Sequence, residues 1–190
     1  MEKALIVSSV QKACDELSLV LQKMNISFID TASSGAAARV MVLERDFDLC
    51  IINAPLKDEL GSMLAQDIAL NGTCQVILIV KAEIFEETAA KVEEAGVFCL
   101  SKPINQQMLW SVLRLAVAAY NKSLRMQRQN TELKSKLDDL KQVSRAKCLL
   151  IEKLNMSEQQ AHRYIEKQAM DMRMTKIQVA KDIISKFGYQ

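Results

Sequence analysis

The first 120 residues alternate between short, mainly apolar runs and longer segments in which apolar residues recur every three or four positions. The runs lie at residues 4–7, 27–31, 48–53, 75–80 and 97–100, and each predicts a strand. The segments at 10–24, 34–45, 59–71 and 84–95, and another that starts near residue 105, have the spacing of helices. Five strands alternating with five helices predict an α/β fold with a doubly wound five-stranded parallel sheet, because parallel neighbours need helical crossovers.

A different pattern follows, because residues 105 to about 155 contain no Pro or Gly and are rich in Leu, Lys, Arg, Gln and Glu. We expect one long helix here. Apolar positions follow a 4-3 spacing with one slip, which predicts a homodimeric coiled coil, with Asn130 as a polar contact that sets the register. The alternative is that the helix folds back on its own domain. The predicted seam consists of Leu113, Val117, Tyr120, Leu124, Asn130, Leu133, Leu137 and Leu140.

The last part of the chain predicts two further helices. Ser157 and Thr175 are expected to cap their starts, and Gly188 to end the second. With the end of the long helix, they would form a small three-helix all-α bundle. The apolar faces expected to be buried comprise Ala161, Ile165 and Ala169 in one helix and Ile177, Ala180, Ile183 and Ile184 in the other. The expected domains are therefore 1–120, a linker helix at 121–143, and 144–190.

Charge divides the chain in the same way as the helix pattern. Residues 1–120 hold 10 Lys and Arg against 15 Asp and Glu, a net −5, whereas residues 121–190 hold 15 against 8, a net +7. A basic C-terminal segment is a candidate for binding nucleic acid, although an ordinary solvated surface has the same composition. No apolar run approaches the roughly 20 residues of a membrane span, and the N-terminus does not resemble a signal peptide, so we expect a cytoplasmic protein without membrane contact.

The sequence does not indicate a metal or cofactor site. Its five cysteines are scattered without a CxxC pair, and His162 is the only histidine. We expect reduced, structural thiols and an exposed His162. Neither a metal nor a cofactor is expected.

Ligand chemistry in such a sheet lies at the carboxyl ends of the strands, which directs attention to Ser8, Ser9, Asn53, Val80 and Lys102. The stretches "ALIVSS", "DLCIINAP", "VILIVKA" and "AGVFCLSKPI" resemble the receiver domain of two-component response regulators over roughly residues 1–120. In that family an acidic pair holds Mg²⁺, an Asp accepts phosphate, a Thr or Ser senses it, and a Lys before Pro pairs with the phosphoryl group.

The matching positions here are Ser8 and Ser9, Asn53, Val80 and Lys102. Of the family's residues, this sequence therefore has only the lysine and the proline that follows it. Hydroxyls carry no charge for a hard cation, and the amide of Asn53 is not a phosphate-accepting nucleophile. The domain therefore resembles a pseudo-receiver. Lys102 is either an exposed loop lysine or a donor to Asn53 Oδ1 or a nearby carbonyl, and the resemblance suggests a cis peptide before Pro103.

Residues 144–184 contain "RAK", "MSEQQA", "QAMDMR" and "VAKDII" and resemble the ANTAR domain, the RNA-binding output module of transcription antiterminators. One departure is Cys148, where the family usually has Gly. The resemblance implies recognition of tandem hairpins in a leader transcript, which would prevent a terminator stem from forming. RNA loops present bases that cationic and aromatic side chains can reach.

The expected RNA-binding residues are mainly cationic. Tyr164 would either stack on a base or pack in the bundle, Gln168 and Asp171 could address base edges, and Met170 at helical spacing is expected in the core. The expected set comprises Arg145, Lys147, Arg163, Tyr164, Lys167, Gln168, Asp171, Arg173 and Lys176.

These patterns predict a non-enzymatic, homodimeric RNA-binding antiterminator whose degenerate receiver responds to a regulatory protein partner or a small ligand. Two other functions stay open. One is a coiled-coil signalling adaptor that does not bind RNA, and the other is a phosphorylation-dependent response regulator. A three-helix bundle could also bind DNA, which salt-matched competition with hairpin RNA would distinguish.

Overall fold

A computed structural model describes residues 1–72 and 74–188. The chain divides into two compact units, Met1–Arg125 and Met126–Gln190. The first contains the sheet, in the chain order β1 (Lys3–Ser8), α1 (Gln11–Gln22), β2 (Phe28–Ala32), α2 (Gly35–Glu44), β3 (Leu49–Asn53), α3 (Ser62–Asn71), β4 (Gln75–Lys81), a 3-10 turn η1 (Ala82–Ile84), α4 (Phe85–Val92) and β5 (Phe98–Lys102). The long helix α5 (Gln106–Leu154) begins in this unit and ends in the second.

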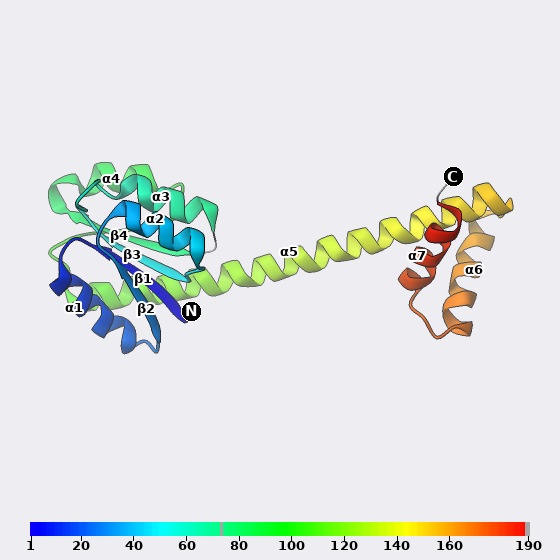
Figure 1. The fold of residues 1–190 in the computed structure, drawn as a ribbon, viewed down its shortest axis with the longest axis horizontal. Helices are drawn as coiled ribbons and strands as arrows, with labels where there is room; N and C mark the ends of the chain where they lie inside the picture. The colour runs from blue at the N-terminus through cyan, green and yellow to red at the C-terminus, as the bar shows by residue number, and fades with distance from the viewer. Residues whose placement is uncertain (73, 189–190) are drawn as a thin grey trace. The chain divides into compact units, whose positions relative to one another are not determined.

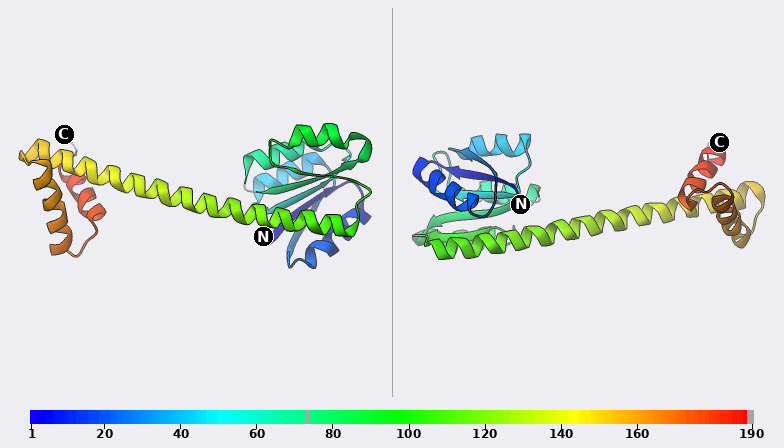
Figure 2. Two further views of the ribbon diagram at one scale, coloured as in Figure 1. Left: turned by 180° about the vertical axis from the view of Figure 1, so that it is seen from behind. Right: turned by 90° about the horizontal axis from the view of Figure 1, so that it is seen from below.

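The five strands form one parallel sheet in the order β2-β1-β3-β4-β5. Helices α2, α3 and α4 cover one face, while α1 and the first part of α5 cover the other (Figures 1 and 2). Two cores result, one on each face, and both are built from strand residues that alternate along the chain. The predicted doubly wound five-stranded α/β sheet is confirmed, with shifts of one to three residues at several element ends.

Helix α3 begins at Ser62 rather than at 59, and the backbone explains the difference. Gly61 directly before it adopts a left-handed φ of 87°, and a Cβ there would lie 3.1 Å from the Cγ2 of Ile52. Residues with side chains rarely adopt this conformation. The glycine therefore determines where the loop after β3 turns into the helix.

The second unit contains the last part of α5 with α6 (Glu158–Asp171) and α7 (Lys176–Phe187). Ser157 and Thr175 cap α6 and α7 in capping boxes with Gln160 and Gln178, as the sequence predicts. The shared core comprises Ala146, Leu150, Ala161, Ile165, Ala169, Val179, Ala180 and Ile183. Ile177 and Ile184, which were expected to be buried, are half-buried, because the buried face of α7 includes Val179 instead.

Two residues of the predicted dimer seam are buried inside the first unit. Leu113 is buried against the sheet, and Tyr120 is buried with its hydroxyl bonded to Oδ1 of Asp48. The assignment of these two residues to a dimer seam is therefore wrong. Their spacing of seven residues suits packing on a sheet as well as packing on a second helix, so the pattern alone does not distinguish the partners.

Candidate functional site

Four polar residues lie at the carboxyl ends of their strands, on the same face of the sheet. Strand alternation places Ser8, Asn53, Lys81 and Lys102 on the side covered by α1 and α5, because Ile6, Ile51, Ile79 and Leu100, two residues earlier in each strand, lie in that core. Parallel pairing sets Ser8 beside Asn53 and Lys81 beside Lys102. Three of the residues predicted from the sequence thus gather at one edge.

Ser8 and Asn53 bond to each other. The Nδ2 of Asn53 donates to the Oγ of Ser8 at 2.9 Å, and the Ser8 hydroxyl also donates to the Val10 carbonyl at 3.3 Å. Ser9 turns elsewhere, donating from Oγ to the Pro55 carbonyl at 3.3 Å. Asn53 therefore acts here as a neutral donor that connects the ends of β3 and β1.

Lys102 is partly buried and points back to the end of β3. Its Nζ donates to the carbonyl oxygen of Ala54 at 2.5 Å, so of the two alternatives for Lys102 the bond to a carbonyl near Asn53 is the one that forms. Burial lowers the pKa of Lys102, and the neighbouring charge of Lys81 lowers it further. The peptide bonds before Pro103, as expected, and before Pro55 are cis.

The side chain that emerges at the carboxyl end of β4 is that of Lys81 rather than Val80. The Val80 side chain is 1% exposed and lies in the core beneath α2, α3 and α4, so its assignment to the pocket is wrong. Lys81 is exposed, and strand alternation places it on the face that is covered by α1 and α5. The alternation of buried residues along β4 was a signal that could have given the correct position.

The edge does not fit a magnesium ion. Ser8, Ser9 and Asn53 offer neutral oxygens, whereas Mg²⁺ is usually bound through one or two carboxylates. In the described part of the chain, no group of three or more His, Cys, Asp or Glu side chains could hold a metal. We therefore derive no phosphoryl transfer through this edge.

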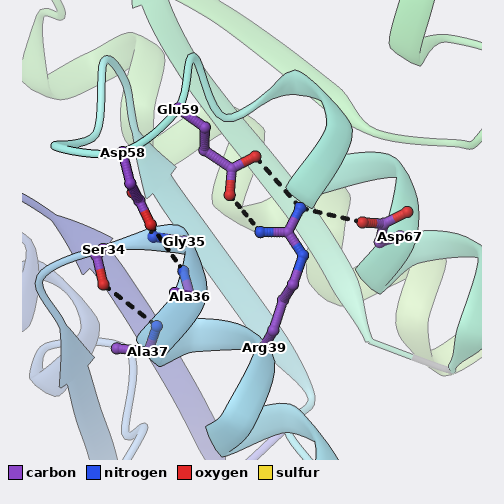
Figure 3. Close-up of polar contacts among 8 residues, drawn as sticks. All are labelled: Ser34, Gly35, Ala36, Ala37, Arg39, Asp58, Glu59 and Asp67. Atoms are coloured by element: carbon purple, nitrogen blue, oxygen red, sulfur yellow. Dashed lines mark hydrogen bonds and ion pairs between the residues drawn. The ribbon is translucent and has the colours of Figure 1, made fainter.

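The carboxylates of the loop after β3, Asp58 and Glu59, bind groups of helix α2 (Figure 3). Asp58 accepts hydrogen bonds at 2.9 Å from the backbone N–H groups of Gly35 and Ala36, and these bonds lower its pKa. Glu59 forms an ion pair with Arg39, which also pairs with Asp67 at 3.1 Å. Both contacts join residues 20 or more positions apart, so local sequence patterns do not indicate them.

A small cavity of about 220 Å³ opens beside Lys81, lined also by Ala54, Pro55, Leu60 and Ile84. A larger cavity of about 400 Å³ is lined by residues of α2 and α3 and by Phe47 and Cys74, which precede β3 and β4. It therefore opens at the amino edge of the strands, away from Lys102. The small cavity alone adjoins the polar residues of the carboxyl edge among the cavities described.

The predicted RNA-binding residues do not form one continuous cationic face. Lys147 pairs with Glu158 at 3.0 Å, and Lys176 pairs with Glu166 at 2.6 Å. Glu166 also lies 3.3 Å from the exposed His162, four residues earlier on α6. Two of the expected phosphate contacts are therefore already matched by carboxylates within the unit.

The remaining residues concentrate on the outer side of α6. Helical spacing of about 3.6 residues per turn places Arg163 and Lys167 on one exposed ridge, and Tyr164 and Asp171 on the adjacent ridge with the half-buried Gln168. Met170, expected in the core, is 78% exposed and lies on the ridge of Arg163 and Lys167. This correction follows from the position of the buried face, which is formed by Ala161, Ile165 and Ala169.

Arg145 and Arg173 complete the set. Both side chains are exposed, Arg145 on the last part of α5 and Arg173 in the turn between α6 and α7, where its φ is 53°. Neither forms an ion pair among the described residues. They extend the cationic surface at two further points of the unit.

Part of the predicted dimer seam is an exposed stripe on α5. Leu133, Leu137 and Leu140 are 58%, 57% and 66% exposed, and Asn130 is exposed beside them. Val117 and Leu124, nearer the sheet, are half-buried. An isolated helix rarely leaves a regular leucine stripe in water, since burying each side chain is favourable by about 1.5–3 kcal/mol.

Comparisons with known proteins match both units. The model of the response regulator receiver domain matches residues 4–114, and the ANTAR domain model matches residues 131–184. The transcriptional regulatory protein PdtaR of Mycobacterium tuberculosis is 25% identical over 174 residues, which cover 91% of this chain and 84% of PdtaR. None of the described helices is long and apolar enough to span a membrane.

Solved structures match the first unit. A two-component response regulator from Clostridium difficile superposes with a TM-score of 0.55 at 23% identity, over 62% of this chain and 97% of that one. An adenylate cyclase structure from Rhodopirellula baltica gives a TM-score of 0.62 at 16% identity, over 68% of this chain and 97% of that one. At these identities the likeness concerns the fold alone.

Proposed function

Because the chain belongs to the response regulator receiver domain family and carries an ANTAR domain, we propose that it is an RNA-binding transcription antitermination regulator of the cytoplasm. It binds tandem hairpins of a leader transcript through its C-terminal unit and has no enzymatic activity of its own. The name of its relative PdtaR, a transcriptional regulatory protein, supports a role in transcription. The observation that carries the proposal is the exposed ridge of α6.

That ridge has the chemistry that single-stranded RNA loops require. Arg163 and Lys167 lie one turn apart and form no ion pair among the described residues, so both are available for phosphates. Tyr164 is 36% exposed next to them, which leaves part of its ring free to stack on an unpaired base. Gln168 and Asp171, one and two turns beyond Tyr164, add groups that hydrogen-bond base edges.

The proposed form is a homodimer joined along α5. The leucine stripe of Leu133, Leu137 and Leu140 keeps 4-3 spacing, which is the pattern that a second copy of the same helix buries. Asn130 extends the stripe as a polar residue of the kind that sets register. Two copies would present two α6 ridges, which suits a target made of two hairpins.

The receiver unit acts in this proposal as a pseudo-receiver. Asn53 donates to Ser8 instead of offering a carboxylate, and neither serine supplies the charge that Mg²⁺ needs. A regulatory protein partner or a small ligand would therefore replace phosphorylation as the signal. Acetyl phosphate with Mg²⁺ should leave the intact mass of the protein unchanged.

An electrophoretic shift without a phosphate donor tests RNA binding. The probe is a tandem-hairpin leader RNA, and the variant is Arg163→Ala/Lys167→Ala. The control is Lys134→Ala/Lys181→Ala, which removes the same charge from exposed residues outside α6. We expect the α6 variant to weaken binding and to reduce the slope of log K against log salt by about 1.4, since each lost phosphate contact contributes about 0.7 for single strands.

Equal losses in the variant and the control would contradict the α6 ridge as the binding surface. Absence of any shift with the unaltered protein at low salt would contradict RNA binding itself. Equal competition by duplex DNA at matched salt would instead indicate non-specific binding of nucleic acid.

A further inference from the structure

The acidic and basic residues of the first unit are separated along the chain. All 15 Asp and Glu residues of the first 120 positions lie before residue 95, where they outnumber 8 Lys and Arg. Residues 95–131 contain no Asp or Glu, but they include Arg114, Lys122 and Arg125 on α5. The first part of α5 is therefore a basic element in an otherwise acidic unit.

This part of α5 has a buried side and an exposed side. Leu113, Ala116 and Tyr120 are buried in the first unit, whereas Arg114 and Arg125 are exposed. The two arginines are separated by eleven residues, which is about three helical turns, so they lie on the same side of the helix. Their Cα atoms are about 16.5 Å apart along the helix axis, at a rise of about 1.5 Å per residue.

Small and polar residues lie between the two arginines. Ala118 and Asn121 are exposed four and seven residues after Arg114, so the four positions form one row, which we call the α5 ridge. Lys122, also exposed, lies beside the row, one turn after Ala118. The Asn121 amide can donate hydrogen bonds to phosphate, and the small side chain of Ala118 lets a polymer lie close to the helix.

The cations of the α5 ridge have no acidic partner among the described residues. The ion pairs of α5 involve lysines beyond residue 131, where acidic residues reappear in the sequence. Asp67 is the single described residue with a further interaction, and it pairs with Arg39 on α2. The guanidinium N–H donors of Arg114 and Arg125 are therefore available to a ligand.

We infer that the α5 ridge binds the phosphate backbone of the RNA that α6 recognises, as a second contact that does not depend on base sequence. Guanidinium groups match phosphate oxygens in charge and in geometry. The ridge contains no aromatic or large apolar side chain of the kind that protein interfaces place at their centre, which favours RNA over an acidic protein. The inference rests on the proposed RNA binding and adds to it a contact in the first unit.

Electrophoretic shifts of the full-length protein with a tandem-hairpin leader RNA, over a series of salt concentrations, test this contact. The variant is Arg114→Gln/Arg125→Gln, and the control is Lys23→Gln/Lys57→Gln, which removes the same charge from exposed residues of the first unit outside α5. We expect the variant to reduce the slope of log K against log salt by about 1.4, or about 0.7 for each lost phosphate contact. Binding at 0.1 M salt should then be roughly 25-fold weaker, with the difference vanishing near 1 M, while the control stays unchanged.

A second measurement separates a phosphate contact from an indirect effect on α6. The same proteins are titrated with an RNA whose loop bases are substituted, and the affinity ratio of the two RNAs is compared. Phosphate contacts carry no base information, so the ridge variant should weaken both RNAs equally and leave the ratio unchanged. Thermal melts and light scattering check that each variant keeps the fold and the oligomeric state of the unaltered protein.

Two results would overturn the inference and keep the proposed function. One is a ridge variant with the salt slope of the control while the unaltered protein shifts the RNA. The other is a reduced affinity ratio, which would assign the loss to a disturbance of the α6 surface. Absence of any shift with the unaltered protein at low salt would overturn both the inference and the proposed function.

Discussion

Besides the apolar packing of α5 on the sheet, one side-chain hydrogen bond from Tyr120 to Asp48 holds the helix, and the effect of removing it can be measured. The Oη of Tyr120 donates to Oδ1 of Asp48, while Oδ2 of Asp48 accepts from the backbone N–H groups of Glu2 and Lys3. Tyr120→Phe deletes the hydroxyl but keeps the ring, so packing is preserved. Hydrogen bonds to charged groups contribute about 1.5–3 kcal/mol.

We expect a loss near the lower end, about 1.5 kcal/mol, because Asp48 retains its two backbone donors. With a urea m-value of about 2 kcal/mol/M, this loss lowers the unfolding midpoint of the first unit by about 0.7 M. Trp110 is the only tryptophan and lies on α5 within that unit, so its fluorescence follows this transition. Tyr164→Phe, which alters an exposed tyrosine of the second unit, serves as the control and should leave the midpoint unchanged.

The pH dependence gives an independent check. Burial alone would raise the pKa of Asp48, but the bonds from Tyr120, Glu2 and Lys3 outweigh it and hold the pKa below its ordinary value of 3.8. A carboxylate with a lowered folded pKa stabilises the fold above pH 3.8, and the contribution is lost as pH falls through the folded pKa. The difference between the two proteins should therefore be constant from about pH 5 to 8 and shrink below about pH 4.

At basic pH the stability contribution of Tyr120 changes with pH in the opposite direction. Burial, and then the hydrogen bond to Asp48, raise the pKa of Tyr120 to about 12. A group with a raised folded pKa stabilises the fold below its ordinary value of 10 and loses that contribution as pH rises toward 12. A midpoint shift under about 0.2 M at pH 7, or one that Tyr164→Phe reproduces, would refute this account of the α5 anchor.

Three further substitutions test other parts of the molecule. Asp58→Asn weakens the cap of α2 and should lower the melting temperature of the first unit; an unchanged melt at pH 7 would contradict the capping role. Asn53→Asp alone should gain no mass from acetyl phosphate and Mg²⁺ in intact-mass spectrometry, because the serines still supply no charge for the metal. Leu133→Lys/Leu137→Lys should convert a dimer to a monomer in light scattering, whereas Leu43→Lys, at an 86% exposed leucine of α2, should not.

The sequence predicts the sheet well because its central strands, β1, β3 and β4, are buried on both faces. Runs such as Leu49–Asn53 and Gln75–Lys81 are almost continuously apolar, which is typical of parallel sheets covered by helices. The caps Ser157 and Thr175 were also predictable, since a capping box involves residues only three positions apart. Local physical rules thus account for most of the fold.

The errors arise where one pattern suits two partners. Leu113 and Tyr120 continue the spacing of the leucine stripe, yet the sheet rather than a second helix buries them. Lys147 and Lys176 have the charge expected of phosphate contacts, but Glu158 and Glu166, 10 or 11 residues away, pair with them. Lys81 was missed by one residue because the end of β4 determines which side chain emerges at the edge. Contacts between distant segments decide the first two cases, whereas the alternation of buried residues along β4 decides the third.

Helix α5 contributes residues to the cores of both units. Its early turns are fixed in the sheet core by Leu113 and Tyr120, and its last turns carry Ala146 and Leu150 into the core of the second unit. Between them the exposed leucine stripe lacks a described partner within the chain. Strands β4 and β5 pack through Ile79 and Leu100 in the same core as Leu113. A change at the carboxyl ends of these strands would therefore reach α5 through this core, so the anchor at Tyr120 and the stripe at Leu133 are the places to test whether α5 is held or paired differently.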